Sequence, residues 1–446
     1  MGYFKRSIDT DLINWFSDSN RKPLLLRGAR QVGKSSAVRE LSKNFEYFIE
    51  LNFEEHSSTI QFFEGDLTPS VICEKLSVYF NTPIIAGKTL LFFDEIQFCP
   101  KAISSLRFFY EKYPELHVIA AGSLLEFALQ SLPSFGVGRI RSIFMHPLSF
   151  NEFLIALGEN RLLDYVKKSS PVNPIPEPLH TKLVELLKKF IVLGGMPEVI
   201  ANYLKNGDIL ACQLVLDDLL HTYKTDFSKY HKNVPELRIL EVFVSVAQQA
   251  GGKFNFSKTN SEANHQQIKQ ALDLLILAGL VIPVTHTSAN GIPLGAEANT
   301  KKRKMIFFDT GLFQRMLGLN IADLLFSTDW NMINKGAIAE QFAGLELYKY
   351  NSPYQREDLF YWSREALNSN AELDYIIAVN GEIYPIEVKA SKSGSMQSLF
   401  LFLKEKNRNI GIRCSMENFS NYESIFVFPL YAIENIKTSL LEMILK

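Results

Sequence analysis

The sequence is poor in the residues and segments that mark secreted or membrane proteins. Only four cysteines occur in 446 residues, no two of them form a C-x-x-C pair, and they stand at Cys73, Cys99, Cys212 and Cys414. This spacing predicts neither a disulfide framework nor a zinc site, and it is typical of a reducing compartment. No apolar run approaches the length of a membrane span, and the N-terminus lacks the apolar core of a signal peptide. We therefore expect a cytoplasmic protein with no membrane partner.

Charge of one sign is also not in excess. The chain has 47 lysines and arginines against 48 aspartates and glutamates, for a formal net charge of -1. The overall charge therefore gives no argument for a nucleic-acid partner, although a local basic patch is a separate question. A hydrophobic content of 47% excludes a disordered chain, and the length predicts two or three domains.

The most informative stretch begins with the apolar run Leu24 to Leu26, which predicts a buried strand. Residues 28–35 follow as GARQVGKS, which fits G-x-x-x-x-G-K-[ST], and a helix-compatible segment comes next. This pattern predicts a phosphate-binding P-loop, in which backbone N–H groups and the N-terminus of a helix face phosphate oxygens. Lys34 would reach the β- and γ-phosphates, and the Ser35 hydroxyl would ligate Mg²⁺. The alternative is a chance match. The predicted nucleotide contacts are Gly28, Ala29, Arg30, Gln31, Val32, Gly33, Lys34, Ser35 and Ser36.

A second predicted strand ends in two carboxylates. Residues 89–97 read TLLFFDEIQ, a buried strand followed by Asp94 and Glu95, which is the Walker B pattern. In open α/β sheets, phosphates bind at the carboxyl edge of the strands, where these side chains would lie. Asp94 would hold Mg²⁺ through water, and Glu95 would polarise the attacking water. The alternative is that the pair caps the next helix.

Two later features are candidates for contact with the γ-phosphate. The strand His117 to Ala121 is followed by Ser123, which would touch the γ-phosphate or the attacking water; alternatively, it is a small residue that closes a strand. The segment 136–142 carries Arg139 and Arg141. Either arginine would stabilise transition-state charge on the nucleotide of a neighbouring subunit in a homo-oligomer, or it is a solvated loop residue. Of the two, we favour Arg139.

Strands that alternate with helices around a P-loop predict a mostly parallel α/β sheet. This part resembles the AAA+ ATPases, and more narrowly a prokaryotic family that pairs such an ATPase with a conserved C-terminal region, DUF4143. The resemblance rests on LLFFDEIQ, on residues 138–153 (GRIRSIFMHPLSFNEF) and on residues 194–198 (GGMPE), and it covers almost the whole chain. It implies ATP with Mg²⁺ as ligands, a sensor 1 role for Ser123, and a signature segment at residues 309–312 (DTGL) whose role is structural.

The middle of the chain has two possible functional parts. A predicted helix over Leu183 to Leu193 runs into Gly195-Met196-Pro197, which is similar to the G-x-P motif of STAND NTPases. That resemblance implies that Pro197 packs near adenine under a helical lid. The alternative is an ordinary helix C-cap. Two helices (237–250 and 265–278) and a strand (280–284) then suggest a winged helix. Its second helix carries one lysine, so a packing or protein-contact role is at least as well supported as DNA binding.

The C-terminal part predicts a second site. A helix carries Glu340, a strand carries Asp374, the turn signal Asn380-Gly381 follows, and a further strand carries Glu387 and Lys389. This order resembles the PD-(D/E)XK nuclease fold, an α/β fold like that of restriction endonucleases. The basic run at 301–304 lies just before this region's signature. Such a run would meet phosphate, but a short charge run is usually a solvated turn, and we interpret it as one.

The chemistry of these four side chains fits a metal-dependent nuclease. The carboxylates of Asp374 and Glu387 are oxygen ligands that suit Mg²⁺ or Mn²⁺, and Glu340 would add a third ligand. Lys389 would orient the attacking water or neutralise the pentavalent phosphate. The alternative is that these residues form surface ion pairs, since a fold does not imply its activity.

We therefore predict four regions: an AAA+-like ATPase domain (1–155), a helical lid (156–232), a winged helix (233–300) and a nuclease-like domain (301–446). One hypothesis is an ATP-hydrolysing protein whose C-terminal domain acts on DNA. The other is an ATP-switched interaction or DNA-binding protein whose nuclease-like domain is not catalytic. The complete set of four residues favours the first, and the neutral charge with the weakly basic helix favours the second.

Overall fold

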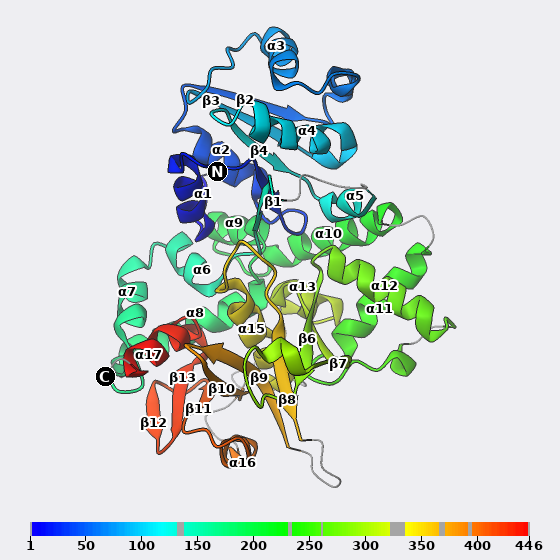
Figure 1. Cartoon of the computed structure of the whole chain (residues 1–446). Coiled ribbons are helices and arrows are strands. Elements are labelled where there is room, and N and C mark those ends of the chain that lie inside the picture. The colour runs from blue at the N-terminus through cyan, green and yellow to red at the C-terminus, as the bar shows by residue number, and fades with distance from the viewer. Residues whose placement is uncertain are drawn as a thin grey trace. The chain divides into compact units, whose positions relative to one another are not determined.

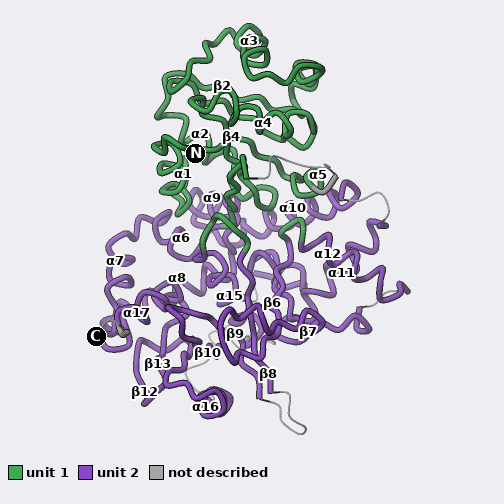
Figure 2. Tube along the Cα trace, in the orientation of Figure 1, with its two compact units in different colours: residues 1–147, 277–279, 352–356 green, residues 148–276, 280–351, 357–446 purple. Residues whose placement is uncertain are grey.

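The computed structural model describes residues 2–131, 138–230, 234–259, 262–321, 335–364, 371–390 and 395–444. Within these ranges the chain forms two compact units, shown in green and purple in Figure 2. Unit 1 comprises residues 1–147, 277–279 and 352–356, and unit 2 comprises the remaining residues. No helix in the described ranges is both long and apolar enough to cross a membrane.

Unit 1 is built on a five-stranded sheet whose neighbouring strands all run parallel. This confirms the parallel α/β fold predicted around the P-loop. The strand order is β2-β3-β4-β1-β5, so the P-loop strand lies between two others, where both of its faces are buried. The strands are β1 (Leu24–Arg27), β2 (Tyr47–Asn52), β3 (Thr89–Asp94), β4 (His117–Ala121) and β5 (Arg141–Phe144).

Helices cover this sheet, and short segments from late in the chain complete the unit. The helices are α1 (Ile8–Ser17), α2 (Lys34–Ser42), α3 (Pro69–Phe80), α4 (Pro100–Lys112) and α5 (Leu125–Ser131), with shorter turns η1 (Ser57–Phe63) and η2 (Ile96–Phe98) (Figure 1). The Phe144 N–H on β5 donates to the Pro353 carbonyl at 2.7 Å. The predicted ATPase domain ended at residue 155, whereas the compact unit ends its first segment at Pro147 and takes in 277–279 and 352–356.

Unit 2 contains helices that come before, between and after its strands in the chain. They are α6 (Phe150–Ala156), α7 (Asn160–Lys168), α8 (Glu177–Leu193), α9 (Pro197–Asn206), α10 (Ala211–Asp226), α11 (Glu236–Gln248), α12 (His265–Leu277), α13 (Thr310–Met316), α15 (Lys335–Lys349), α16 (Gln397–Glu405) and α17 (Asn435–Ile444), with turns η3 (Phe227–Lys229), η4 (Phe256–Lys258), η5 (Leu294–Glu297) and η6 (Leu430–Ala432). Helix α8 begins at Glu177 with Pro178 in its first turn, where proline is tolerated.

The helices of unit 2 pack with an eight-stranded mixed sheet of order β12-β13-β11-β10-β9-β8-β6-β7. Its strands are β6 (Val281–Thr287), β7 (Ala298–Phe307), β8 (Leu359–Ser363), β9 (Glu372–Val379), β10 (Glu382–Val388), β11 (Gly411–Ser415), β12 (Ser420–Tyr422) and β13 (Ile425–Pro429). Strand β6 pairs with β7 on one side and with β8 on the other. The strand expected in the winged helix therefore belongs to the same sheet as the C-terminal strands, and β7 runs across the predicted boundary at residue 300.

Strand β7 also corrects one prediction. The basic run at residues 301–304 was interpreted as a solvated turn, but these residues lie within β7. Lys304 pairs across the sheet with Val284 of β6, and its side chain is only 2% exposed. A charge run predicts a solvated surface only when its charges have no partners, and Lys304 has buried carboxylate partners, described below.

Two segments that carry the family resemblance meet inside unit 2. Asp309, which caps α13, accepts hydrogen bonds from the Leu312 N–H at 3.0 Å and from the Gly195 N–H at 2.7 Å. A Cβ on Gly194 would overlap the Asp309 carboxylate, and a Cβ on Gly311 would overlap the Leu193 carbonyl oxygen. The glycines of residues 194–198 and 309–312 are therefore explained by close backbone packing at the end of α8.

Candidate functional site

The predicted P-loop of unit 1 turns at two glycines that have positive φ. Gly28 has φ of 135°, and a Cβ there would overlap the Met145 carbonyl oxygen. Gly33 has φ of 100° and forms the N-cap of α2, so that the helix begins at Lys34. Both positions use backbone conformations that side-chain-bearing residues rarely adopt. Residues 28–36 thus join the carboxyl end of β1 to the N-terminus of α2, where N–H groups and the helix dipole favour an anion.

Lys34 is buried within this loop. Its ammonium donates hydrogen bonds to the carbonyl oxygens of Gly28, at 2.9 Å, and Ala29, at 2.7 Å. Burial lowers the pKa of Lys34 to about 8, against the opposing effect of Glu95 and Asp94. The ammonium that would meet a phosphate is therefore already inside the loop, and it is easier to deprotonate than an exposed lysine.

The two carboxylates at the end of β3 face different partners. The Ser35 hydroxyl donates to Asp94 Oδ2 at 2.7 Å, so the residues predicted to hold Mg²⁺ are in contact. Burial raises the pKa of Asp94, which a nearby cation would reverse. A hydroxyl and a carboxylate at the mouth of a P-loop are a donor set that fits Mg²⁺.

Glu95 is held by two residues from different elements. Its Oε2 atom accepts hydrogen bonds from the Gln97 side-chain amide at 2.5 Å, the Ser123 hydroxyl at 2.9 Å and the Ser123 N–H at 3.1 Å. A Cβ on Gly122 would overlap Gln97 Oε1, so this glycine leaves room for the amide. The structure therefore brings Ser123 to Glu95, and it adds Gln97. The signal for Gln97 was present in the LLFFDEIQ segment, but that segment was interpreted only for its two carboxylates.

Arg6 is a second residue that sequence reasoning missed. Its guanidinium donates to the Val32 carbonyl in the P-loop at 3.0 Å and to the His146 carbonyl at 2.6 Å. The side chain is buried and lies before α1. No sequence motif marks an isolated arginine that supports a loop 26 residues later.

The structure places the other predicted nucleotide contacts as follows. Arg139 forms an ion pair with Glu111 of α4 and is 41% exposed, and Arg141 contacts Asp18 at 3.3 Å. Pro197 is the first residue of α9 in unit 2. The predicted roles of these three residues stay predictions.

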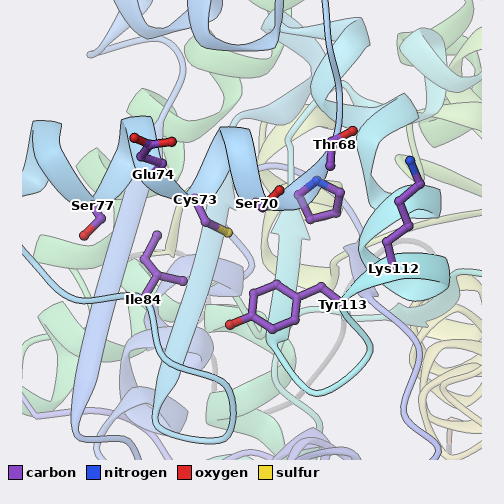
Figure 3. Close-up of a pocket in the computed structure, with 9 residues that line it drawn as sticks. Thr68, Ser70, Cys73, Glu74, Ser77, Ile84, Lys112 and Tyr113 are labelled. Carbon is purple, nitrogen blue, oxygen red and sulfur yellow. The ribbon is translucent and has the colours of Figure 1, made fainter.

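A hollow in unit 1 lies apart from the P-loop. It has a volume of about 440 Å³ and is lined by α3 and by the end of α4, including Cys73, Lys112 and Tyr113 (Figure 3). Burial raises the pKa of the Cys73 thiol to about 12, so this cysteine is not a reactive thiolate. None of the predicted site residues lines this hollow.

In unit 2 the structure brings the four predicted C-terminal site residues into one cluster. Asp374 on β9 accepts the Val388 N–H of β10 at 2.8 Å, and Lys389 forms an ion pair with Glu387. Glu340 on α15 lies against β9, because the Tyr375 hydroxyl donates to its carbonyl oxygen at 2.8 Å. A Cβ on Gly344 would overlap that same hydroxyl, so the glycine permits the close approach of α15.

A fifth residue, which was not predicted, lies in this cluster. The Lys304 ammonium is 2.8 Å from Glu340 Oε1, 2.7 Å from Glu372 Oε1 and 3.5 Å from Asp374 Oδ1. Burial alone would lower the pKa of Lys304, but these three carboxylates outweigh it and raise the pKa above its usual range. We call Lys304, Glu340, Glu372, Asp374, Glu387 and Lys389 the carboxylate cluster.

The carboxylate cluster does not fit the predicted metal ion. In the described ranges, no group of three or more His, Cys, Asp or Glu residues is arranged to hold a metal. Burial, together with the nearby Asp374 carboxylate, raises the pKa of both Glu340 and Glu387 to about 7. An unpaired site of several buried carboxylates would need a cation, and here the lysine ammonium supplies the positive charge.

Comparison with known families divides the chain into three consecutive regions. Residues 20–154 match an AAA domain, residues 184–323 match a domain of unknown function, DUF8612, and residues 335–433 match a second one, DUF4143. No curated protein sequence matches the chain.

Two solved structures are distantly similar. The Walker-type ATPase PABY2304 of Pyrococcus abyssi is 14% identical, with a TM-score of 0.45 over 71% of this chain and 96% of that one. Unliganded Pif1 from a Bacteroides species is 15% identical, with a TM-score of 0.22 over 37% of this chain and 49% of that one. At these TM-scores neither structure informs the fold of this chain.

The AAA domain match defines the class of the first region. Residues 20–154 form an AAA domain, and the P-loop lies within it. More particularly, the AAA domain is followed by a C-terminal DUF4143 region, which confirms the pairing that the sequence motifs predicted.

Proposed function

We propose that the chain binds ATP at the P-loop of unit 1 and hydrolyses it with Glu95 as the residue that polarises the attacking water. Ser35 and Asp94 would hold Mg²⁺, which neutralises charge on the β- and γ-phosphates when bound. Lys34 would bind the same phosphates, and Ser123 and Gln97 would orient Glu95. The supporting observation is the joint placement of these groups: Ser35 contacts Asp94 at 2.7 Å, and Ser123 and Gln97 contact Glu95.

Steady-state ATP hydrolysis by four variants tests this proposal. Lys34→Ala should abolish tight ATP binding, and unchanged nucleotide affinity would refute the P-loop assignment. Glu95→Gln should bind ATP yet lose hydrolysis by a factor of roughly 10² or more, the usual contribution of a general base. Gln97→Ala should lower kcat less than this. It should have no further effect when combined with Glu95→Gln, because the amide acts only through that carboxylate.

We further propose that the helices after residue 155 form a lid in which Pro197 contacts adenine. We also propose that Arg139 acts on the nucleotide of a neighbouring subunit. The proposal for Arg139 is supported by its exposure and by its position just before β5. Arg139→Ala should lower the hydrolysis rate only at protein concentrations where subunits associate. An equal loss of rate in a strict monomer would contradict a role between subunits.

A second function is proposed for the C-terminal region: contact with DNA through a nuclease-like fold. The supporting observation is that α15, β9 and β10 bring Glu340, Asp374, Glu387 and Lys389 together. The test is incubation of the protein with linear, single-stranded and branched DNA, with Mg²⁺ or Mn²⁺, with and without ATP, beside Asp374→Ala. Cleavage that is lost in the variant would establish a nuclease. Binding without cleavage would support an ATP-switched DNA-binding protein, and the absence of both would refute a DNA partner.

A further inference from the structure

We infer that the Lys304 ammonium occupies the place of the divalent cation in the carboxylate cluster, so that the C-terminal region is a metal-independent relative of the nuclease fold. The inference rests on the proposed likeness to metal-dependent nucleases, because that likeness is what makes a metal expected at Glu340, Asp374 and Glu387. It does not rest on DNA binding or on ATP hydrolysis.

The first support is the position of the charge. The ammonium lies within 2.8 Å of Glu340 Oε1 and 3.5 Å of Asp374 Oδ1, two of the three carboxylates that a metal would need. Its third partner, Glu372 at 2.7 Å, is on the same strand as Asp374 but was not among the predicted ligands. A divalent ion at these oxygens would lie in direct contact with a buried ammonium, and the repulsion between the two cations would be poorly screened there.

The second support is that two further carboxylate oxygens of the cluster already have partners within the protein. Asp374 Oδ2 accepts the Val388 N–H at 2.8 Å, and Glu387 Oε1 pairs with Lys389. Glu387 Oε2 is a buried oxygen without a hydrogen-bond partner, but a single oxygen does not make a site for Mg²⁺ or Mn²⁺.

The third support is the burial of Lys304 itself. Its side chain is 2% exposed and lies 5.4 Å from the centre of the Tyr361 ring, so the ammonium cannot move into water without unpacking β7. A buried lysine is tolerated only when it is paired, and removal of one partner would leave charge uncompensated. The ammonium therefore links β7, α15 and β9, and it supplies positive charge to three carboxylates without a bound metal.

The inference predicts that a metal site can be created by removing this ammonium. In Lys304→Met, a side chain of similar length without charge leaves Glu340, Glu372 and Asp374 to be neutralised by another cation. We expect this variant to bind about one equivalent of Mn²⁺, and we expect that binding to be lost when Asp374→Asn is added. The protein that retains Lys304 should show no Mn²⁺ binding that depends on Asp374.

The experiment uses the full chain without nucleotide, and every variant carries Asp94→Asn so that the P-loop cannot contribute a metal site. Free Mn²⁺ is measured by electron paramagnetic resonance, and folding is checked by circular dichroism. Two results would overturn the inference: Mn²⁺ binding by the Lys304 protein that Asp374→Asn removes, or a folded Lys304→Met protein that gains no Mn²⁺.

If Lys304→Met fails to fold, the comparison between the Lys304 protein and its Asp374→Asn variant still decides whether metal and ammonium coexist. The Mn²⁺ measurement also tests the inference independently of the proposed DNA function. Failure to bind DNA would leave the Mn²⁺ measurement unchanged, whereas an Asp374-dependent Mn²⁺ site in the Lys304 protein would refute the inference even if DNA is bound.

Discussion

At the residue scale, we expect Lys34 to make ATP binding depend on pH near and above pH 8. Burial lowers the pKa of Lys34 to about 8 in the nucleotide-free protein. As the pH rises above 8, the ammonium must regain a proton before it can bind phosphate, so ATP affinity should fall about tenfold per pH unit. Titration of a fluorescent ATP analogue at pH 7, 8 and 9 measures this fall.

The matched control for this prediction is Lys34→Arg, because a guanidinium stays charged throughout this range. Its affinity should be weaker than that of the wild type but independent of pH. Global unfolding at higher pH would not account for the fall in ATP affinity. Between pH 8 and 10.5 the unfolded chain binds more protons at Lys34 than the folded chain does, so this residue's contribution to stability rises with pH. A wild-type affinity that stays constant from pH 7 to 9 would contradict the prediction.

Individual residues also show which parts of the candidate site could be predicted from the sequence. The P-loop and the Asp94-Glu95 pair could be predicted because their spacing along the chain is the signal, and the roles assigned to them stay predictions. Gln97 stands two residues from Glu95, in a segment that was interpreted only for its two carboxylates. Arg6 could not be assigned, because its partner atoms are brought near only by folding. Lys304 was misinterpreted for the same reason, since three basic neighbours indicate solvent while its carboxylate partners lie 36 to 70 residues later.

At the scale of secondary-structure elements, strands with clear apolar runs and turn signals were predictable. The strand Glu372–Val379 and the turn at Asn380-Gly381, where both residues have positive φ, agree with the prediction. Strand β7 was missed because four consecutive basic residues stand in its middle and interrupt the alternation, and it is stabilised by pairing with β6. A strand without alternating apolar residues leaves no local periodicity to detect.

Helix α13 provides a prediction at this scale. Asp309 is almost fully buried and caps the helix while it also accepts the Gly195 N–H. Asp309→Ala would leave two buried N–H groups without an acceptor, so we expect a loss of about 2–4 kcal/mol in the free energy of unfolding of unit 2. Urea denaturation followed by circular dichroism measures this loss.

Two variants calibrate this measurement. Asp309→Asn keeps an acceptor oxygen and should cost less than the alanine variant. Asp208, which is exposed, accepts the Leu210 N–H at 2.8 Å just before α10, so Asp208→Ala removes a similar interaction where water can replace it. We expect this control to cost no more than about 1 kcal/mol. Equal losses at positions 208 and 309 would show that the buried link to Gly195 contributes nothing.

At the scale of the whole molecule, the ATPase unit is discontinuous in sequence, which a contiguous prediction for residues 1–155 missed. The Phe144 N–H of β5 donates to the carbonyl of Pro353, a residue outside the first segment of the unit, which ends at Pro147. Arg356 also belongs to this unit: it donates to the Leu277 carbonyl at 3.2 Å and lies 3.5 Å from Glu126. No local pattern indicates that a five-residue segment after α15 completes a sheet that begins more than 300 residues earlier.

The last prediction follows from this discontinuity. Arg356→Ala in the full chain leaves Glu126 paired only with Arg27, which donates to it at 2.6 Å, and removes the guanidinium that lies over the Phe144 ring. We expect a loss of about 1–2 kcal/mol, or roughly 3–6 °C in the melting transition that ATP shifts. Arg139→Ala, at an exposed arginine of the same unit, should change this transition by less than about 1 °C.

A fragment of residues 1–147 should lose more thermal stability than the Arg356→Ala variant does, because the fragment lacks Pro353 as well. If the fragment instead melts with the ATP-dependent transition of the full chain, residues 277–279 and 352–356 do not stabilise the ATPase unit, and the shorter contiguous domain is sufficient.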